Sequence, residues 1–296
     1  MSNFISQFLH YLEVERGFSP RTIVAYQHDL NKFVDFLGTS DDKSITAVTK
    51  NDVRQFLSQR AKTNGAVTRA RKLSSIKSFF KYLGREGIIE ANPVSDIEAP
   101  KLPEKEPSYL TESEYQNLIA AVKVKATPYY LSRDLAIVML LLGTGIRLSE
   151  LVGLTLDRVN LDNADRSIKV CGKGNKERII PLTNEVVCTL QQYLKHRPEV
   201  ESSHLFISRL GGELHSRSVY GLIKKYLKAA GIKKEKAAVH TLRHTYGASM
   251  LKTGASIYAI QKLLGHKKIE TTGRYLHISD VDLRNAVEKL VLSKPL

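Results

Sequence analysis

The chain has 296 residues, of which 42% are hydrophobic and 25% charged, values that exclude a fibre or a largely disordered chain. A net charge of +15 favours a polyanionic partner, and residues 201–296 hold 17 Lys and Arg against 7 Asp and Glu. The two cysteines, Cys171 and Cys188, exclude a disulfide framework and a CxxC zinc pair. No apolar run is long enough to cross a membrane, so we expect a cytoplasmic protein without membrane attachment.

Four helices are predicted in the first hundred residues. Ser19 suits the N-cap of the second helix, Pro20 its first position and Gly38 the position after its end. The four apolar stretches at helical spacing fall within residues 5–12, 20–37, 49–59 and 67–84.

The last of these helices has a basic side. Its polar positions hold four cations with no acid between them: Arg69, Lys72, Lys77 and Lys81. We interpret them as candidates for contact with DNA phosphates, and the alternative is an ordinary solvated face.

A proline-rich segment follows, which predicts a boundary between two domains. Prolines at 100, 103 and 107 lie among charged residues with no apolar periodicity, which indicates a linker. We place a domain at 1–99, the linker at 100–109 and a second domain at 110–296. Thr111 and Glu114 predict a capping box at the start of the next helix.

The second domain is predicted to be mostly helical with a small antiparallel sheet, so the fold class is mainly α (α+β). The stretch "RSIKVCGKGNKERIIPL" alternates apolar and polar residues around a Gly/Asn turn, which predicts a β-hairpin. A buried helix ends at Gly145. Further helices are expected over 183–195, 216–230, 240–253, 256–264, about 270–276 and 280–292.

The stretch "GTGIRLSEL" is the first of four that suit phosphate chemistry. Arg147 lies near a helix start, where free amides and the helix dipole favour an anion. Glu150, three residues later, is a candidate to orient Arg147, and a plain surface carboxylate is the alternative.

The second stretch, "CGKGNKER", places Lys173 between two glycines at the predicted hairpin tip. An ammonium there could protonate a leaving oxygen. Lys176 is a competitor for that role, and a solvated turn is the alternative for both.

The third and fourth stretches add histidines, an arginine and a tyrosine. In "HTLRHTYGASM", His240 and Arg243 share one helix face. A zinc site is not expected, because Thr241 stands where a zinc peptidase has its glutamate. In "LLGHKKIETTGRYLH", His266 follows a glycine, and Tyr275 comes nine residues later.

Together these residue types suit reversible phosphodiester transfer. The reaction needs charge on the phosphate oxygens, an in-line nucleophile and an acid for the leaving oxygen. Two arginines, a lysine and histidines can supply the charge and protons, so no metal or other cofactor is expected. A phenol with a pKa of about 10 leaves more readily than a sugar hydroxyl, so a phosphotyrosine link can be rejoined without ATP.

The strings "GTGIRLSEL", "GKGNKERIIPL", "HTLRH" and "LGH" with the later tyrosine resemble the tyrosine recombinase (phage integrase) family, above all its Xer branch. "FSPRTIVAYQHDLNKFVDFL" is similar to the core-binding domain of that family, which implies a four-helix, SAM-like fold for residues 1–99. The resemblance implies Tyr275 as nucleophile, Arg147 and Arg243 as phosphate clamps, and Lys173 as acid. It implies that His240 hydrogen-bonds the phosphate or accepts the phenolic proton, and that His266 stabilises the transition state.

The resemblance also implies partners. Family members act on double-stranded DNA with inverted-repeat core sites, as tetramers on paired sites that pass through a Holliday junction. We therefore expect a monomer or weak oligomer when free, and a homotetramer or a complex with a second recombinase on DNA. The expected role is the resolution of chromosome or plasmid dimers during chromosome partition and cell division.

Three alternatives stay open: an integrase of a mobile element, a type IB topoisomerase, and a non-catalytic DNA-binding relative. Lys267 and Lys268 after His266 are further DNA-contact candidates. Gly273 costs about 1 kcal/mol in a helix, so we expect the tyrosine segment to order on assembly. The C-terminal helix packs either on a neighbouring protomer or on its own subunit.

Overall fold

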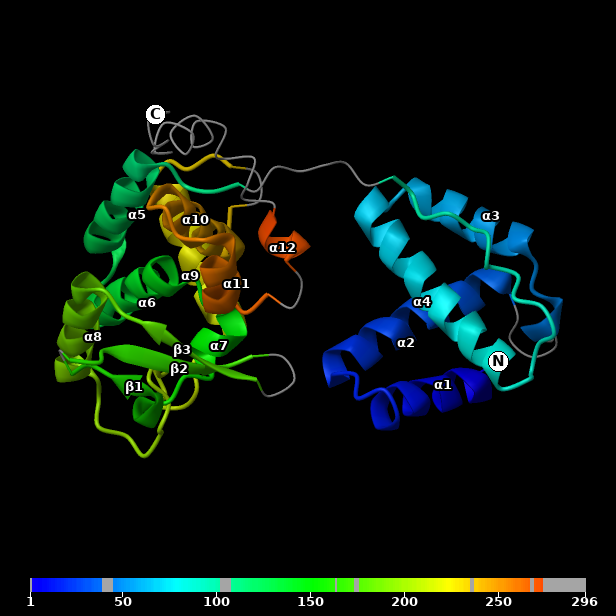
Figure 1. Ribbon diagram of the computed structural model, residues 1–296, viewed down its shortest axis with the longest axis horizontal. Helices are drawn as coiled ribbons and strands as arrows, with labels where there is room; N and C mark the ends of the chain where they lie inside the picture. The colour runs from blue at the N-terminus through cyan, green and yellow to red at the C-terminus, as the bar shows by residue number, and fades with distance from the viewer. Residues whose placement is uncertain are drawn as a thin grey trace, which may run out of the picture. The chain divides into compact units, whose positions relative to one another are not determined.

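The computed structural model describes residues 2–38, 45–101, 108–162, 164–172, 176–234, 237–266 and 269–273. The chain divides into two compact units, residues 1–105 and 106–296, which we describe separately (Figure 1). No helix within the described ranges is long and apolar enough to span a membrane.

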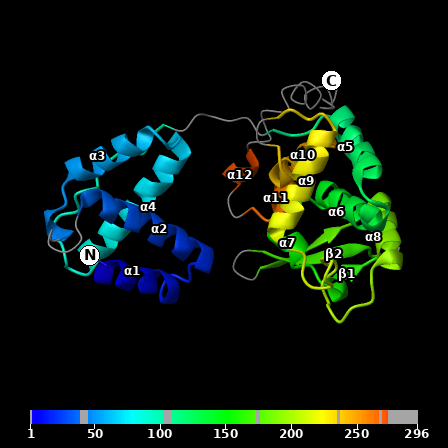
Figure 2. The same cartoon turned by 180° about the vertical axis from the view of Figure 1, so that it is seen from behind.

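The described residues of the first unit form four α-helices, as the sequence predicts (Figure 2). Its elements are α1 (Ser2–Val14), α2 (Pro20–Leu37), the 3₁₀ turn η1 (Ile45–Ala47), α3 (Lys50–Ala61) and α4 (Ala66–Arg85). Helix α2 packs against α1 and α4 around an aromatic core whose members are at most 1% exposed: Phe8, Phe33, Phe56, Phe79 and Phe80. Gly38 ends α2 with φ +64°, as expected, but the Ser19 hydroxyl bonds the Thr22 hydroxyl (2.9 Å) and does not cap the helix.

One member of the predicted basic side of α4 is not a surface residue. Asp29 on α2 is fully buried and accepts hydrogen bonds from Arg71, from Lys72 Nζ (3.0 Å) and from Ser75 Oγ (3.1 Å). The Lys72 side chain is only 7% exposed. The expectation that Lys72 contacts DNA is therefore wrong, because the lysine neutralises a buried carboxylate in its own domain.

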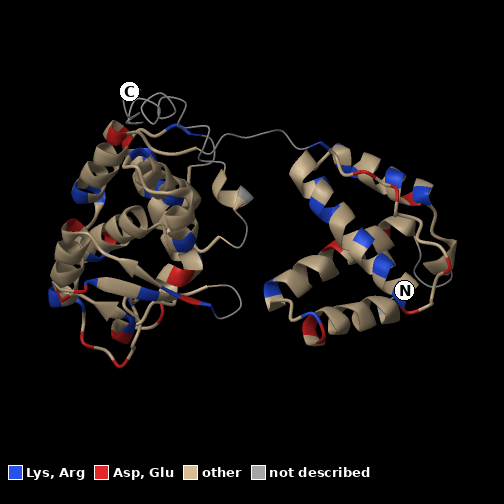
Figure 3. Cartoon of the chain, viewed as in Figure 1, with Lys and Arg blue, Asp and Glu red and all other residues tan. Residues whose placement is uncertain are grey.

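The other three candidates on α4 differ in exposure. Lys81 is exposed, Arg69 is half-buried, and Lys77 is half-buried with its ammonium donating to the Ser95 carbonyl (3.2 Å). Figure 3 shows Lys and Arg positions in blue along α4.

In its described residues the second unit is mostly helical with a three-stranded antiparallel sheet, so the predicted fold class is confirmed (Figure 1). The antiparallel strands β1 (Val159–Asn160), β2 (Ser167–Cys171) and β3 (Glu177–Pro181) are ordered β1-β2-β3, with Ile168 opposite Ile180. The short strand β1 was not predicted. The helical elements are α5 (Glu112–Lys125), η2 (Pro128–Tyr130), α6 (Leu131–Thr144), α7 (Leu148–Val152), η3 (Leu156–Arg158), α8 (Asn184–His196), α9 (Ser216–Ala229), α10 (Val239–Lys252), α11 (Ile257–Leu264) and α12 (Glu270–Gly273).

The starts and ends of these helices follow the sequence signals. Thr111 and Glu114 form the predicted capping box, with N–H···O distances of 2.8 and 3.2 Å. Helices α8 to α11 agree with the predicted ranges to within a residue at each end. The helix predicted over 280–292 lies outside the described residues.

Helix α6 is the centre of this unit and brings the functional segments together. Nine of its 14 residues are buried, it packs against α5, α8 and α10, and it ends at Gly145 with φ +60°. Helix α11 contacts both α10 and β3. The end of α6, the start of α7, the hairpin and the end of α11 therefore meet at one place.

Candidate active site

The start of α7 fixes Arg147 against Glu150. The backbone N–H of Arg147 donates to Glu150 Oε2 (2.7 Å), and its Nη1 donates to Oε1 (2.9 Å). Nη2 donates to the carbonyl of Gly265 (2.8 Å). The contact between Arg147 and Glu150 that the sequence predicts is present, and Glu150 is buried rather than a surface carboxylate.

A second arginine, Arg178 on β3, shares the same carboxylate. Its Nη1 and Nη2 donate to the two Glu150 oxygens, each at 2.8 Å, and its Nε donates to the carbonyl of Leu263 (2.8 Å). Sequence reasoning missed Arg178. The signal in the sequence is that Arg178 lies two residues before Ile180, which is fully buried, so both lie on the inward face of the strand. A charged residue on that face needs a partner.

Glu150 is ionised despite its burial. Burial raises the pKa of this carboxyl, but hydrogen bonds from Arg178 and from the backbone and side chain of Arg147, together with the charge of Arg178, outweigh it and lower the pKa to about 2. The carboxylate therefore stays charged throughout the neutral range and holds both arginines.

Helix α10 supplies Arg243 and His240, one turn apart. Arg243 is 6% exposed, and its guanidinium donates to the carbonyls of Gly145 (2.6 Å) and Leu264. His240, at the helix start, is exposed on one side and covered by protein on the other. Partial burial of its ring and the charges of Arg243 and Arg147 lower the pKa of His240 below 6.5, so the ring is neutral at pH 7.

The C-terminal end of α11 collects all three arginines. Gly265, with φ +64°, ends the helix and leaves three successive carbonyls exposed to donors. The carbonyls of Leu263, Leu264 and Gly265 accept from Arg178, Arg243 and Arg147 respectively.

His266, the next residue, is held from two directions. Its backbone N–H donates to the Gln261 carbonyl (3.1 Å), and Gln261 Nε2 donates back to the His266 carbonyl (3.1 Å). Its ring nitrogen Nδ1 bonds the hydroxyl of Thr272 (2.9 Å), which is fully buried. The contact fixes the orientation of the ring at the edge of the site.

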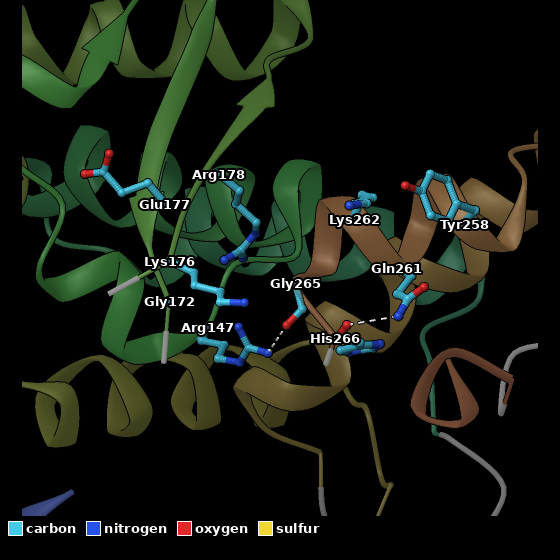
Figure 4. Close-up of a pocket in the computed structure, with 10 residues that line it drawn as sticks. All are labelled: Arg147, Gly172, Lys176, Glu177, Arg178, Tyr258, Gln261, Lys262, Gly265 and His266. Atoms are coloured by element: carbon cyan, nitrogen blue, oxygen red, sulfur yellow. Dashed lines mark hydrogen bonds between the residues drawn. The ribbon is translucent and has the colours of Figure 1, made fainter. Parts of the chain in front are cut away.

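A cavity of about 690 Å³ opens beside these groups. Figure 4 shows its two walls, with Arg147, Lys176 and Arg178 on one and Gln261, Lys262 and His266 on the other. Its remaining lining residues are Gly172, Glu177, Tyr258 and Gly265. Glu177 pairs with Lys169 (2.6 Å), so the cavity is predominantly positive and suits a phosphate.

The structure thus brings together Arg147, Glu150, Lys176, Arg243 and His266, with His240 close enough to respond to both arginines. Lys173, Lys267, Lys268 and Tyr275 lie outside the described residues. Among the residues that are described, no three His, Cys, Asp or Glu side chains are grouped as metal ligands.

Comparison with known proteins shows the family of this chain. The model of the phage integrase family matches residues 108–281, and that of the phage integrase N-terminal SAM-like domain matches residues 5–87. The chain belongs to the phage integrase family, the tyrosine recombinases. The family predicted from the sequence is confirmed.

Relatives of this tyrosine recombinase match nearly end to end. Tyrosine recombinase XerC of Thermodesulfovibrio yellowstonii is 36% identical, with 99% of this chain and 96% of the relative covered. Tyrosine recombinase XerD of Lacticaseibacillus casei is 36% identical over 96% of both chains. The solved structure of XerH site-specific recombinase bound to its palindromic difH substrate has a TM-score of 0.79 at 20% identity, covering 96% and 84% of the two chains.

Proposed function

We propose that this tyrosine recombinase cuts and rejoins DNA at specific sites through a covalent 3′-phosphotyrosyl link to Tyr275. The observation that carries the proposal is the fixed pair Arg147 and Arg243, whose guanidiniums rest on neighbouring carbonyls at the end of α11. Two guanidiniums held this close together can bind both non-bridging oxygens of one phosphate.

The cleavage step follows from these groups. The Tyr275 oxygen attacks the scissile phosphorus, and the bond from phosphorus to the 5′-oxygen breaks. Arg147 and Arg243 neutralise the charge that develops on the non-bridging oxygens, and the His266 imidazole donates to one of them. The 5′-oxygen takes a proton from Lys173 and departs as a hydroxyl.

The phenolic proton needs an acceptor, and His240 suits that task. The lowered pKa keeps its ring neutral at pH 7, so one ring nitrogen is free of a proton. Rejoining is the reverse: a 5′-hydroxyl of the partner strand attacks the phosphotyrosine and releases Tyr275. Phosphodiester bonds are conserved in number, so no external energy source is needed.

For the DNA-bound form we propose four copies on paired inverted-repeat sites, with a monomer or weak oligomer in the absence of DNA. Solved relatives include a lambda integrase tetramer bound to a Holliday junction, at a TM-score of 0.73 and 20% identity. Lys176 at the cavity and Arg69, Lys77 and Lys81 on α4 are proposed DNA contacts, with Lys267 and Lys268 after His266. A tetramer that includes a second recombinase is the alternative assembly.

Dimer resolution in the cytoplasm is the proposed cellular role. Near-full-length identity of 36% to XerC and XerD proteins supports it over integration of a mobile element. Similarity to the Tn1549 transposon integrase, at 20% identity, reflects the shared fold.

The test is Tyr275→Phe on a nicked suicide substrate that carries the recombination site. The variant should bind DNA as the wild type does and form no covalent adduct, because it lacks the attacking oxygen. Tyr258→Phe, on the cavity wall, is the matched control and should form adduct. A persistent adduct in Tyr275→Phe would assign the nucleophile elsewhere, and relaxation of any supercoiled plasmid by the wild type would favour a topoisomerase.

A further inference from the structure

Arg178 has a different set of contacts from the two arginines proposed to clamp the phosphate. Its side chain is 13% exposed, and three of its donors are committed to protein acceptors: both oxygens of Glu150 and the carbonyl of Leu263. Arg147, in contrast, has a side chain that is 34% exposed. Arg243 is also buried, at 6% exposed, so burial alone does not set Arg178 apart. Arg178 commits two of its donors to the carboxylate that also holds Arg147.

The contacts of Arg178 join three separate segments. It projects from β3, the second strand of the hairpin, and binds Glu150 on α7 and the last turn of α11. Glu150 in turn holds Arg147, and the last turn of α11 precedes His266. One side chain therefore connects the strand that follows Lys173 with the elements that carry Arg147 and His266.

From this geometry we infer that Arg178 is a positioning residue for the cleavage reaction: it holds Glu150, and through it Arg147, in register with the end of α11. A guanidinium presents its donors as a rigid fork, and this fork spans two carboxylate oxygens and a carbonyl at once. A lysine has one nitrogen at the end of a flexible chain and cannot reproduce the arrangement.

The turn at Gly265 packs tightly onto Arg178. A Cβ at residue 265 would lie 3.0 Å from Nη1 and 3.2 Å from Cζ of Arg178. Such contacts are shorter than normal, so the turn and the guanidinium fit each other without spare space. Loss of the guanidinium would leave a cavity under the turn as well as unpaired acceptors.

This inference rests on the proposed function, and the experiment separates the two. Single-turnover cleavage of the suicide substrate at saturating DNA, DNA affinity and thermal unfolding are measured for wild type, Arg178→Met and Arg178→Lys. The wild type should form adduct, and its failure to do so would count against the function rather than the inference. Both variants should cleave about 100-fold more slowly, the loss expected for a displacement on the order of 1 Å, while DNA affinity stays within about threefold.

The matched control is Arg166→Met. Arg166 precedes β2 in the same sheet and also donates to a backbone carbonyl, that of Leu182 (2.9 Å), but it has no bond to Glu150. This variant should cleave at the wild-type rate. If Arg178→Met and Arg166→Met lose the same activity and the same thermal stability, Arg178 is only a structural residue and the inference fails.

A double variant tests the route through Glu150. If Arg178 acts through this carboxylate, Arg178→Met combined with Glu150→Gln should cleave no more slowly than the slower single variant. Losses that multiply would show that Arg178 acts independently and would overturn the inference. Should Arg178→Met not fold, Arg178→Lys, which keeps the charge, is compared with Glu150→Gln in the same way.

Discussion

Two buried carboxylates, one in each unit of the chain, hold pairs of cations in nearly the same way. Asp29 accepts from Arg71 and Lys72, and Glu150 accepts from Arg147 and Arg178. The Asp29 side chain is 0% exposed and that of Glu150 is 2% exposed. Burial and ion pairing alone therefore do not distinguish a structural cluster from one that serves a reaction.

The difference lies in what surrounds each cluster. Asp29 has a hydroxyl, that of Ser75, as a further partner within a packed helix pair. Beside Glu150 lie three helix-end carbonyls that bind arginines and a cavity of about 690 Å³. Cations with both an anchoring acceptor and a cavity to face are the ones suited to a substrate.

The largest effect that tests the difference between the two clusters is expected from the Asp29→Asn substitution, on the free energy of unfolding. The amide leaves the ammonium of Lys72 buried without its counter-charge, which should cost about 3–5 kcal/mol of the free energy of unfolding in urea. Cleavage per folded molecule at saturating DNA should be unchanged, whereas Glu150→Gln should lower it.

The control for that pair is Asp96→Asn. Asp96 is 78% exposed and pairs with Lys50 at 3.7 Å, so the change should cost less than about 1 kcal/mol. Slower cleavage by folded Asp29→Asn would mean that the cluster of the first unit also serves the reaction.

A smaller effect is expected from acid, and it concerns Glu150. Its pKa is about 2 in the folded protein and 4.5 ordinarily, so its ionisation stabilises the fold above pH 4.5 and this contribution disappears as the pH falls toward 2. The difference corresponds to about 3 kcal/mol at neutral pH. Urea unfolding of the wild type and Glu150→Gln from pH 7 to pH 2.5 should show the two free energies converging, and a constant gap would contradict the assignment.

The smallest effect sharpens the comparison within α4. Lys81→Met should lower the slope of log affinity for DNA against log salt by about 1, because one phosphate contact is lost. Lys72→Met should leave the slope unchanged, because this ammonium is already neutralised by Asp29. Equal slopes for wild type and Lys81→Met would remove Lys81 from the proposed interface.

The sequence predicts the local structure well because local signals determine it. The Thr111 capping box, Gly38 and the hairpin all follow from residues within a few positions of one another. Arg147 and Glu150 are three apart, so their contact could also be expected.

Contacts between residues far apart in the sequence could not be predicted from such local signals. Arg178 and Glu150 are 28 positions apart, and Lys72 and Asp29 are 43 apart. Both pairs leave a trace in the periodicity, because Asp29 lies among the apolar positions of α2 and Arg178 lies beside Ile180 on the inner face of β3. The trace shows that a partner is needed but not which residue it is.

The shared end of α11 has a consequence for the charge that a bound phosphate meets. Three guanidiniums and one carboxylate give the cluster of Arg147, Arg178, Arg243 and Glu150 a formal charge of +2. A phosphodiester carries one negative charge, whereas the five-coordinate species between substrate and product carries two. The charge of the cluster therefore exceeds that of the phosphodiester in the substrate and equals that of the five-coordinate species in magnitude. The cluster binds the five-coordinate species more strongly than the substrate, and this difference lowers the barrier to the reaction.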